Sequence, residues 1–178
     1  MCTAITYQTA DHYFGRNLDY EHPFPCMVTI TPRNLILRFR NGTVLDRHFA
    51  MIGMSIVEDD YPLYFDATNE YGLSIAGLNF PGNAVYLPEK AGMDNIAPFE
   101  FIPWILGDCE NISQVREKLK NLNLVDIPYS EKFPLSDLHW IIADRERSIV
   151  LESTVEGIRL YDNPVNILTN NPPFEYHL

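Results

Sequence analysis

Short strand-like segments separated by turns fill the first 80 residues of the chain. Segments 3–8 and 12–18 are rich in β-branched and aromatic residues and flank a polar turn at 9–11, which predicts a hairpin at the start of the chain. Turn sequences such as Asn41-Gly42 separate further segments of this kind. These further strands are predicted at 27–31, 35–39, 50–57, 63–67 and 73–78. Their spacing favours an antiparallel sheet.

The middle of the chain changes to a helical pattern. The apolar run 98–106 carries Pro103, which predicts a kinked or broken helix that ends at Gly107. Asn111 is placed to cap a second, amphipathic helix whose apolar stripe reaches Leu119. Strands return at 138–143, 148–153, 157–161 and 165–168. This order predicts an α+β fold, an antiparallel sheet with helices on one face, in a single domain over 1–178.

Composition excludes several classes of function. The chain has 24 acidic and 13 basic residues, a formal charge of −11, and no basic run interleaved with aromatic residues, so we expect no nucleic-acid partner. No segment is apolar for long enough to span a membrane. Three widely spaced cysteines predict neither a disulfide framework nor a metal site, and favour a reducing, cytoplasmic location.

A cysteine directly follows the first methionine. If Met1 is removed, Cys2 carries a thiol and a free α-amine on one residue. The pKa of an α-amine is ordinarily about 7.7–8.0 and that of a thiol about 8.5, so the two groups can exchange a proton near neutral pH. Proton exchange of this kind activates a covalent nucleophile.

Arg16 and Asp19 are predicted to lie near Cys2, because the hairpin folds the second strand back beside the first. Arg16 would favour the thiolate, and Asp19 would orient the α-amine. Residues three apart on a regular strand point to opposite faces, so both can serve one site only if the strand bulges or ends between them.

The residues alone leave other interpretations open. A cysteine at position 2 is more often a buried packing residue than a nucleophile, and an arginine and an aspartate near a strand end usually form a surface ion pair. A cysteine–histidine hydrolase is a further possibility, although His139 in LHWIIA is more typical of a packed strand residue. The candidate histidines are His12, His22, His48, His139 and His177.

Five motifs together give a stronger indication. MCTAITYQT, YFGRNLDY, YFDATNEYGLSIAGLNFPG, LHWIIADRERSIVLE and ILTNNPPFEY resemble, in order and spacing, the choloylglycine hydrolase family of bile salt hydrolases and penicillin V acylases. The resemblance implies an N-terminal nucleophile hydrolase, an αββα sandwich that cleaves a linear amide without a cofactor. It implies that Cys2 is the nucleophile, Arg16 and Asp19 its activating pair, and Asn79 and Asn170 polar donors around the oxyanion and substrate.

The resemblance also indicates a substrate. Family members similar to bile salt hydrolases have asparagine at the position of Asn79, where penicillin V acylases tend to have tyrosine, so we expect an amphipathic glycine- or taurine-conjugated bile acid. The negative charge of the chain gives no long-range attraction for an anionic steroid, so binding would depend on an apolar pocket. Candidate pocket residues are Tyr20, Phe24, Met27, Ile56 and Tyr61.

Length is the main departure from the family. Members are nearly twice as long and are expected to be homo-oligomers, and a further active-site arginine of theirs has no counterpart here. We therefore expect an N-terminal portion of the domain, truncated on the C-terminal side, with weak or no activity of its own. Alternatives are an acylase for penicillin V or another N-acyl amine, an inactive remnant, or a class II glutamine amidotransferase, which typically has Gly-Ile after its cysteine where this chain has Thr3-Ala4.

Overall fold

A seven-stranded antiparallel sheet forms the centre of the fold, in the order β13-β12-β11-β8-β7-β6-β3. The computed structural model describes residues 1–19 and 25–177. The strands of the large sheet are β3 (Met27–Thr31), β6 (Met51–Glu58), β7 (Tyr61–Asn69), β8 (Ser74–Asn79), β11 (Leu138–Ala143), β12 (Ser148–Thr154) and β13 (Gly157–Asp162).

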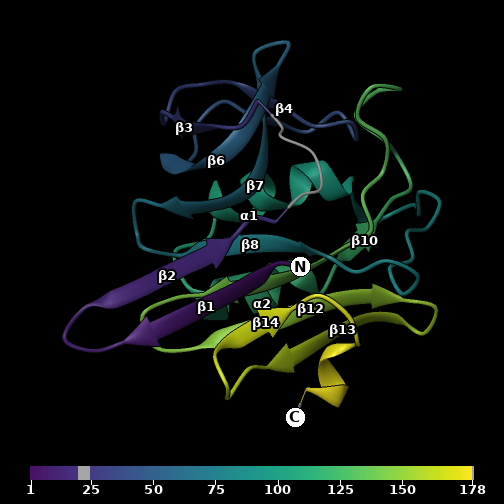
Figure 1. The fold of residues 1–178 in the computed structure, drawn as a ribbon. Coiled ribbons are helices and arrows are strands. Elements are labelled where there is room, and N and C mark those ends of the chain that lie inside the picture. Colours follow the sequence, from purple (N-terminus) through teal and green to yellow (C-terminus); the bar gives the residue numbers. More distant parts are fainter. Residues whose placement is uncertain (20–24, 178) are drawn as a thin grey trace.

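A three-stranded antiparallel sheet lies against the large one and contains the start of the chain. Its order is β14-β1-β2, so β1 (Thr3–Gln8) has β2 (His12–Asn17) on one side and β14 (Ile167–Thr169) on the other. Figure 1 shows the purple β1–β2 hairpin beside the yellow β14. Segments from the two ends of the chain therefore pair directly, and this pairing positions the residues around Cys2.

Short elements complete the fold. The strand pairs are β4 (Leu37–Arg38) with β5 (Val44–Leu45), and β9 (Asp94–Ile96) with β10 (Leu122–Leu124), and the second pair is parallel. The helices are η1 (Pro98–Glu100), α1 (Phe101–Leu106), α2 (Ile112–Leu119) and η2 (Phe174–Tyr176). Asn111 caps α2 by accepting a hydrogen bond from the Gln114 backbone at 3.1 Å.

Two hydrophobic clusters lie on opposite faces of the large sheet. The larger cluster packs α1 and α2 against one face and includes Trp140, Ile142 and Leu151. The smaller cluster fills the space toward the three-stranded sheet and includes Ile141 and Val150. This alternation follows the two-residue period of a strand. The described residues thus form three layers, helices, large sheet and small sheet, of the predicted αββα sandwich.

Most of the predicted elements are present. The N-terminal hairpin, the antiparallel sheet and the capped helix are confirmed. The kinked or broken helix is a 3-10 turn followed by α1, and Pro103 lies in the first turn of α1, where a backbone N–H has no partner within the helix. The predicted strand 35–39 is wrong in extent: only Leu37–Arg38 pairs, because turns at Pro32–Leu35 and Phe39–Gly42 limit it on both sides.

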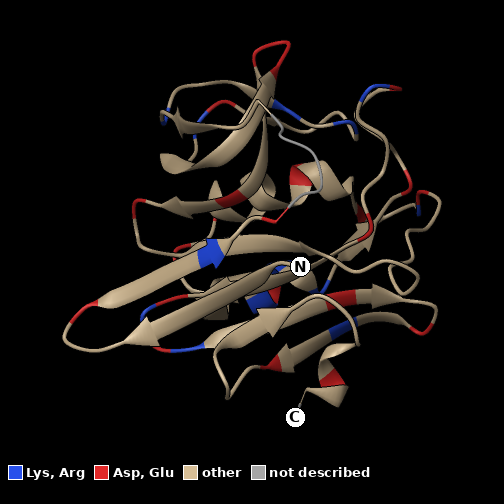
Figure 2. Ribbon diagram, in the orientation of Figure 1, with Lys and Arg blue, Asp and Glu red and all other residues tan. Residues whose placement is uncertain are grey.

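The parallel pair β9–β10 was not predicted, because each strand has only three residues. Within residues 1–19 and 25–177, no helix is long and apolar enough to cross a membrane. Over the same residues, no group of three or more His, Cys, Asp or Glu side chains is arranged to hold a metal ion. Figure 2 shows that charged residues lie mainly in the loops and turns, with few on the strands.

Candidate active site around Cys2

Cys2 is buried between the two sheets. It immediately precedes β1, and only 4% of its surface is exposed. Its neighbours in the smaller hydrophobic cluster include Ala4, Leu168 and Phe174. The expectation that a cysteine at this position packs in the core is therefore correct as a description of its surroundings, whatever its chemistry.

The backbone nitrogen of Cys2 is held by Asn170. Asn170 Oδ1 accepts a hydrogen bond from this nitrogen at 2.5 Å, and Asn170 Nδ2 donates to the backbone oxygen of Asn79 at 2.6 Å. The strand register explains the contact between Cys2 and Asn170. Because Thr3 pairs with Thr169, the residue before Thr3 and the residue after Thr169 lie side by side. One asparagine side chain therefore links the start of β1 to the end of β8.

Asp19 lies beside the N-terminus. Its carboxylate accepts a hydrogen bond from the α-amine of Met1, and this contact raises the pKa of the amine above its ordinary value of 8.0. The Cys2 thiol lies 3.9 Å from the backbone oxygen of Asp19, within reach of a weak S–H donor. Strand β2 ends at Asn17, between Arg16 and Asp19, so the strand geometry that a shared site requires is present.

Arg16 makes its contacts away from Cys2. Its side chain is 6% exposed, and Nη1 donates to the backbone oxygens of Phe65 at 3.2 Å and Gly77 at 3.0 Å. The same nitrogen lies 3.8 Å from the Asp66 carboxylate. Burial raises the pKa of Asp66, and the charge of Arg16 partly opposes that rise. Arg16 thus joins β2 to β7 and β8, and its predicted effect on the thiolate stays a prediction.

The side chain of Asn79 is not among the groups that form this network in the described structure. It is exposed and makes no hydrogen bond to the described residues, although its backbone oxygen accepts from Asn170. Asn17 has contacts that the sequence did not indicate: its Oδ1 accepts from the Thr3 backbone at 2.7 Å, and its Nδ2 donates to the Met1 carbonyl at 3.1 Å. The pairing of Thr3 with Asn17 across the hairpin was the signal available for it.

An apolar cavity of about 300 Å³ lies next to the backbone groups that Arg16 binds. Its wall includes Phe65 and Gly77, the residues whose backbone oxygens Arg16 binds. Mostly apolar and aromatic side chains line the rest, including Ile56, Leu63, Phe99, Ile102, Phe133 and Leu135. Arg16 therefore connects the hairpin that carries Cys2 to the wall of this cavity.

The predicted pocket residues differ in their positions. Ile56 lines the cavity. Tyr61 packs against Phe99 and Tyr129, which line it, and burial raises the pKa of Tyr61 well above its usual value. Met27 lies on the edge strand β3, is half exposed and is not part of the wall. Tyr20 and Phe24 lie outside the described residues.

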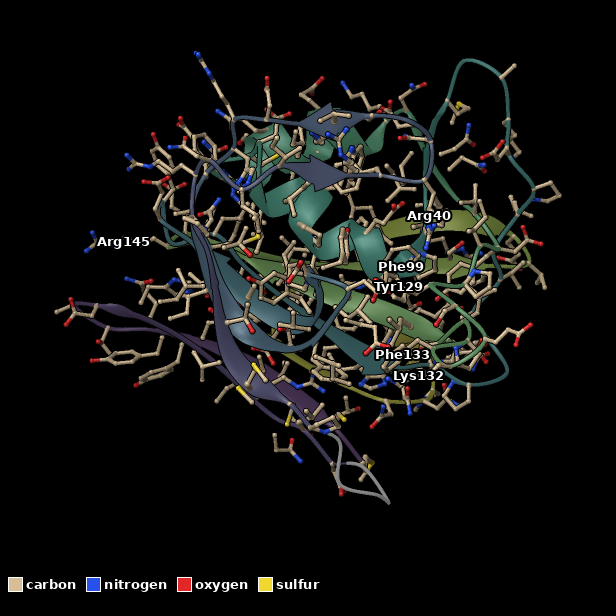
Figure 3. The ribbon with its side chains drawn as sticks, turned by 90° about the horizontal axis from the view of Figure 1, so that it is seen from above. Arg40, Phe99, Tyr129, Lys132, Phe133 and Arg145 are labelled. Atoms are coloured by element: carbon tan, nitrogen blue, oxygen red, sulfur yellow. The ribbon has the colours of Figure 1, made fainter. Side chains whose placement is uncertain are left out.

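A loop on the far side of the cavity is fixed by polar contacts. Arg40 donates to the backbone oxygen of Tyr129 at 2.8 Å, and its guanidinium lies over the rings of Phe99 and Tyr129. Tyr129 donates to the backbone oxygen of Glu58 at 2.8 Å, and Lys132 forms an ion pair with the Glu58 carboxylate. Figure 3 shows the labelled members of this group along one side of the molecule, with Arg145 on the opposite side.

A second, polar cavity of about 350 Å³ lies beneath the tip of the β1–β2 hairpin. Arg145 lines it and donates to the backbone oxygen of Ala10 at 3.0 Å. His12 also lines it, and burial lowers the pKa of this histidine.

No histidine in the described part of the chain forms a hydrogen bond with Cys2, so the contacts give no support to the cysteine–histidine alternative. His139 is fully buried, as the strand interpretation predicts.

Comparison with known proteins identifies the family. Residues 2–178 match the family of linear amide C–N hydrolases called the choloylglycine hydrolase family. A bile salt hydrolase/transferase of Lactiplantibacillus plantarum is 55% identical over 178 residues, which are 100% of this chain and 55% of the relative. A bile salt hydrolase/transferase of Clostridium perfringens is 42% identical over 183 residues, covering 100% of this chain and 56% of the relative.

Solved structures agree on the fold. A C2A mutant of conjugated bile acid hydrolase from Clostridium perfringens has a TM-score of 0.93 and 41% identity, and the match covers 99% of this chain and 55% of that one. Penicillin V acylase from Agrobacterium tumefaciens has a TM-score of 0.78 at 15% identity, over 98% of this chain and 54% of that one, and so shares the fold. The chain spans about half the length of the relatives that it matches. On this sequence and structural evidence, the chain belongs to the choloylglycine hydrolase family of linear amide C–N hydrolases.

Proposed function

We propose that this chain carries the nucleophile site of an enzyme that hydrolyses the amide bond of glycine- or taurine-conjugated bile salts. Cys2, freed by removal of Met1, is the nucleophile. The observation that carries the proposal is the pair of contacts at Cys2: its nitrogen bound by Asn170 Oδ1 at 2.5 Å, and its thiol 3.9 Å from the backbone oxygen of Asp19. The names of the relatives indicate bile salts as the substrate class.

The reaction balances without a cofactor. The Cys2 thiolate attacks the amide carbonyl carbon and forms a carbon–sulfur bond. The carbon–nitrogen bond then breaks, and the α-amine of Cys2 gives its proton to the departing glycine or taurine nitrogen. Water, deprotonated by the same amine, attacks the thioester, so that the bile acid leaves and the thiol is restored. In this scheme the exposed amide of Asn79 is a donor for the oxyanion, because it carries no charge that binding would have to desolvate.

The α-amine would be oriented by the groups that now surround the N-terminus. Asn170 Oδ1 already accepts from the Cys2 nitrogen, and an amine at that position keeps this acceptor. The Asp19 carboxylate, which binds the Met1 amine one residue away, is the anion that we assign to it. The apolar cavity next to the Arg16 contacts suits the apolar ring system of an amphipathic substrate better than it would suit a polar substrate.

The test begins with the state of the N-terminus. Intact-mass measurement of the purified chain is expected to show loss of Met1, and an acyl analogue that reacts with thiols is expected to modify Cys2 faster than Cys26. Cys26 is exposed, so it serves as an internal control for simple accessibility. Cys109 is buried, and burial raises the pKa of its thiol to about 11, so it should remain unlabelled. Equal labelling of Cys2 and Cys26 would contradict the proposal.

A substrate panel separates the bile salt activity from the alternatives. Glycocholate, taurocholate and penicillin V are supplied to the purified chain, with Cys2→Ala as the blank. Release of glycine or taurine above the blank supports the bile salt assignment. Faster cleavage of the penicillin V amide than of the two bile salts supports the acylase alternative. Covalent labelling of Cys2 without turnover of any of the three supports a site that is chemically competent but lacks other parts of the enzyme.

A further inference from the structure

His139 and Glu152 form a buried pair directly behind the Cys2 site. Both side chains are fully buried, and His139 Nδ1 lies 3.0 Å from Glu152 Oε1. His139 belongs to β11 and Glu152 to β12, and their positions share the strand face of Ile141 and Val150, which points toward the small sheet. The reaction proposed above does not use either residue.

The contacts of this pair lead to both asparagines of the site. His139 Nε2 lies 2.9 Å from the backbone oxygen of Thr169, the residue before Asn170. The His139 ring stacks on Phe80, the residue after Asn79, with the ring centres 4.3 Å apart. Asn170 and Asn79 are themselves joined by a 2.6 Å hydrogen bond. His139 therefore contacts a chain neighbour of each of these two asparagines.

Glu152 holds the next part of the same segment. Its Oε1 accepts a hydrogen bond from the Phe174 backbone at 2.9 Å, and Phe174 is buried in the cluster that contains Cys2. Its Oε2 is buried and has no hydrogen-bond partner among the described residues. Segment 169–174 is therefore attached to the large sheet at two backbone groups, one on each side of Asn170 and the following turn.

The hydrogen bonds fix the number of protons in the pair. The Thr169 oxygen can only accept, so His139 Nε2 carries a proton. A second proton must lie between Nδ1 and Glu152 Oε1, because two acceptors would repel at 3.0 Å. The pair has no net charge in either arrangement of that second proton, which permits its burial beside an apolar cluster.

We propose that His139 and Glu152 are positioning residues that hold Asn170 against the nitrogen of Cys2. This inference rests on the proposed function for its chemical meaning, but its geometric content can be measured without catalysis. The observable is hydrogen exchange of the Asn170 side-chain amide, whose Nδ2 donates to the Asn79 oxygen. Nuclear magnetic resonance of the nitrogen-15-labelled 178-residue chain reports this exchange.

Two substitutions at one position separate the two bonds of the imidazole. Glutamine places a donor near the position of the histidine Nε2, so His139→Gln can keep the hydrogen bond to Thr169. Asparagine places its polar atoms near the position of Nδ1, so His139→Asn loses the hydrogen bond to Thr169. We expect His139→Asn to speed exchange of the Asn170 amide about tenfold, the effect of one lost buried hydrogen bond. His139→Gln is expected to restore the rate to within about twofold of the parent. Glu152→Gln, which keeps the acceptor for Phe174, should also stay near the parent rate.

Ser148→Ala is the matched control. Ser148 lies at the opposite end of β12, is buried, and donates to Asn166 Oδ1 at 2.9 Å, so its loss removes a buried hydrogen bond away from Asn170. It should lower the melting temperature without changing exchange at Asn170. Exchange that is unchanged in His139→Asn, equally fast in His139→Gln, or equally accelerated by Ser148→Ala would overturn the proposal.

Reactivity of Cys2 is recorded in the same variants. The ratio of Cys2 to Cys26 alkylation is expected to fall in His139→Asn and recover in His139→Gln. If the parent chain shows no preference for Cys2, the proposed function fails, while the exchange of the Asn170 amide still decides whether His139 positions Asn170.

Discussion

Asn170 Oδ1 binds the backbone nitrogen of Cys2 at 2.5 Å, and the two residues are 168 positions apart in the chain. The contact exists because β1 pairs with β14, so it forms only when the small sheet is assembled. In the proposed enzyme this acceptor would orient the α-amine of the nucleophile. The hydrogen bond between Asn170 and Cys2 therefore depends on folding and bears on the proposed chemistry of the site.

Replacing Asn170 should affect both stability and reactivity. Asn170→Ala removes the acceptor for the Cys2 nitrogen and the donor to the Asn79 oxygen, and we expect a loss of about 1–3 kcal/mol in the free energy of unfolding. Denaturant unfolding measures it, and the Cys2 to Cys26 labelling ratio should fall with it. The control is Asn171→Ala, because Asn171 is exposed and, among the described residues, its side chain binds only the turn at Pro81 and Asn83. An equal fall in the ratio for both variants would contradict a specific role for Asn170.

Replacing Asp19 should lower the pKa of the N-terminal amine. In the chain that retains Met1, the hydrogen bond from the amine to Asp19 is the largest cause of the raised pKa. In Asp19→Asn the charged amine loses the negative charge of this acceptor, so it should give up its proton at lower pH than in the parent. Titration of the amine by nuclear magnetic resonance checks the direction. Asp11→Asn, on the exposed hairpin turn, is the control that should leave the amine unchanged.

Arg16 should control the ionisation of Asp66. Burial raises the pKa of Asp66 in the folded chain, and Arg16 opposes that rise. In Arg16→Leu the opposing charge is lost, so the pKa of Asp66 should rise further. A carboxyl titration followed by carbon-13 resonances measures this shift, and an unchanged or lower pKa would contradict the assignment.

The same substitution has a defined effect on stability as a function of pH. The folded state holds the Asp66 proton more tightly than the unfolded state, so this group contributes stability that is fully present below its unfolded pKa. That contribution is lost as pH rises through the folded-state pKa. In Arg16→Leu the raised pKa extends this loss to higher pH, so the stability difference from the parent should grow as pH increases toward neutrality.

Gly53 and Gly15 form a matched pair of glycines within strands. A Cβ at Gly53 in β6 would lie 2.0 Å from the backbone oxygen of Asp66 and 2.6 Å from the Cα of Ala67, whereas a Cβ at Gly15 in β2 would meet nothing within 4 Å. Gly53→Ala must therefore move backbone between β6 and β7, and should cost about 3 kcal/mol of stability. Gly15→Ala should remain within about 0.5 kcal/mol of the parent. Thermal or denaturant unfolding of the two variants compares them directly.

The sequence was most informative where local chemistry sets the structure. The β1–β2 hairpin follows from alternating residues around a polar turn, and the start of α2 follows from Asn111, whose side chain caps the helix as expected. The strand end between Arg16 and Asp19 was needed for a shared site, and β2 does end at Asn17. These features depend on contacts between residues that are close in the chain.

Features that depend on distant contacts were harder to predict. The placement of Arg16 beside the thiol stays a prediction, whereas its hydrogen bonds to the backbone oxygens of Phe65 and Gly77 could not be predicted, because backbone groups leave no mark in residue identity. The partnership of His139 with Glu152 depends on the register between β11 and β12, and no short motif encodes that register. Asn17 was likewise missed, because its role depends on which backbone groups the hairpin register presents to it.

The Met1 amine bound to Asp19 has a practical consequence for how this protein is made. Any peptide fused ahead of Cys2 keeps the Cys2 nitrogen in an amide bond, as Met1 does here, and so withholds the basic amine that the proposed chemistry needs. Met1 is 77% exposed, so an affinity tag at this end would extend into solvent. Such a preparation would give the spectra of the folded chain, but Cys2 would lack its free α-amine and would not react. Purification tags therefore belong at the other end, or must be cleaved so that Cys2 becomes the first residue.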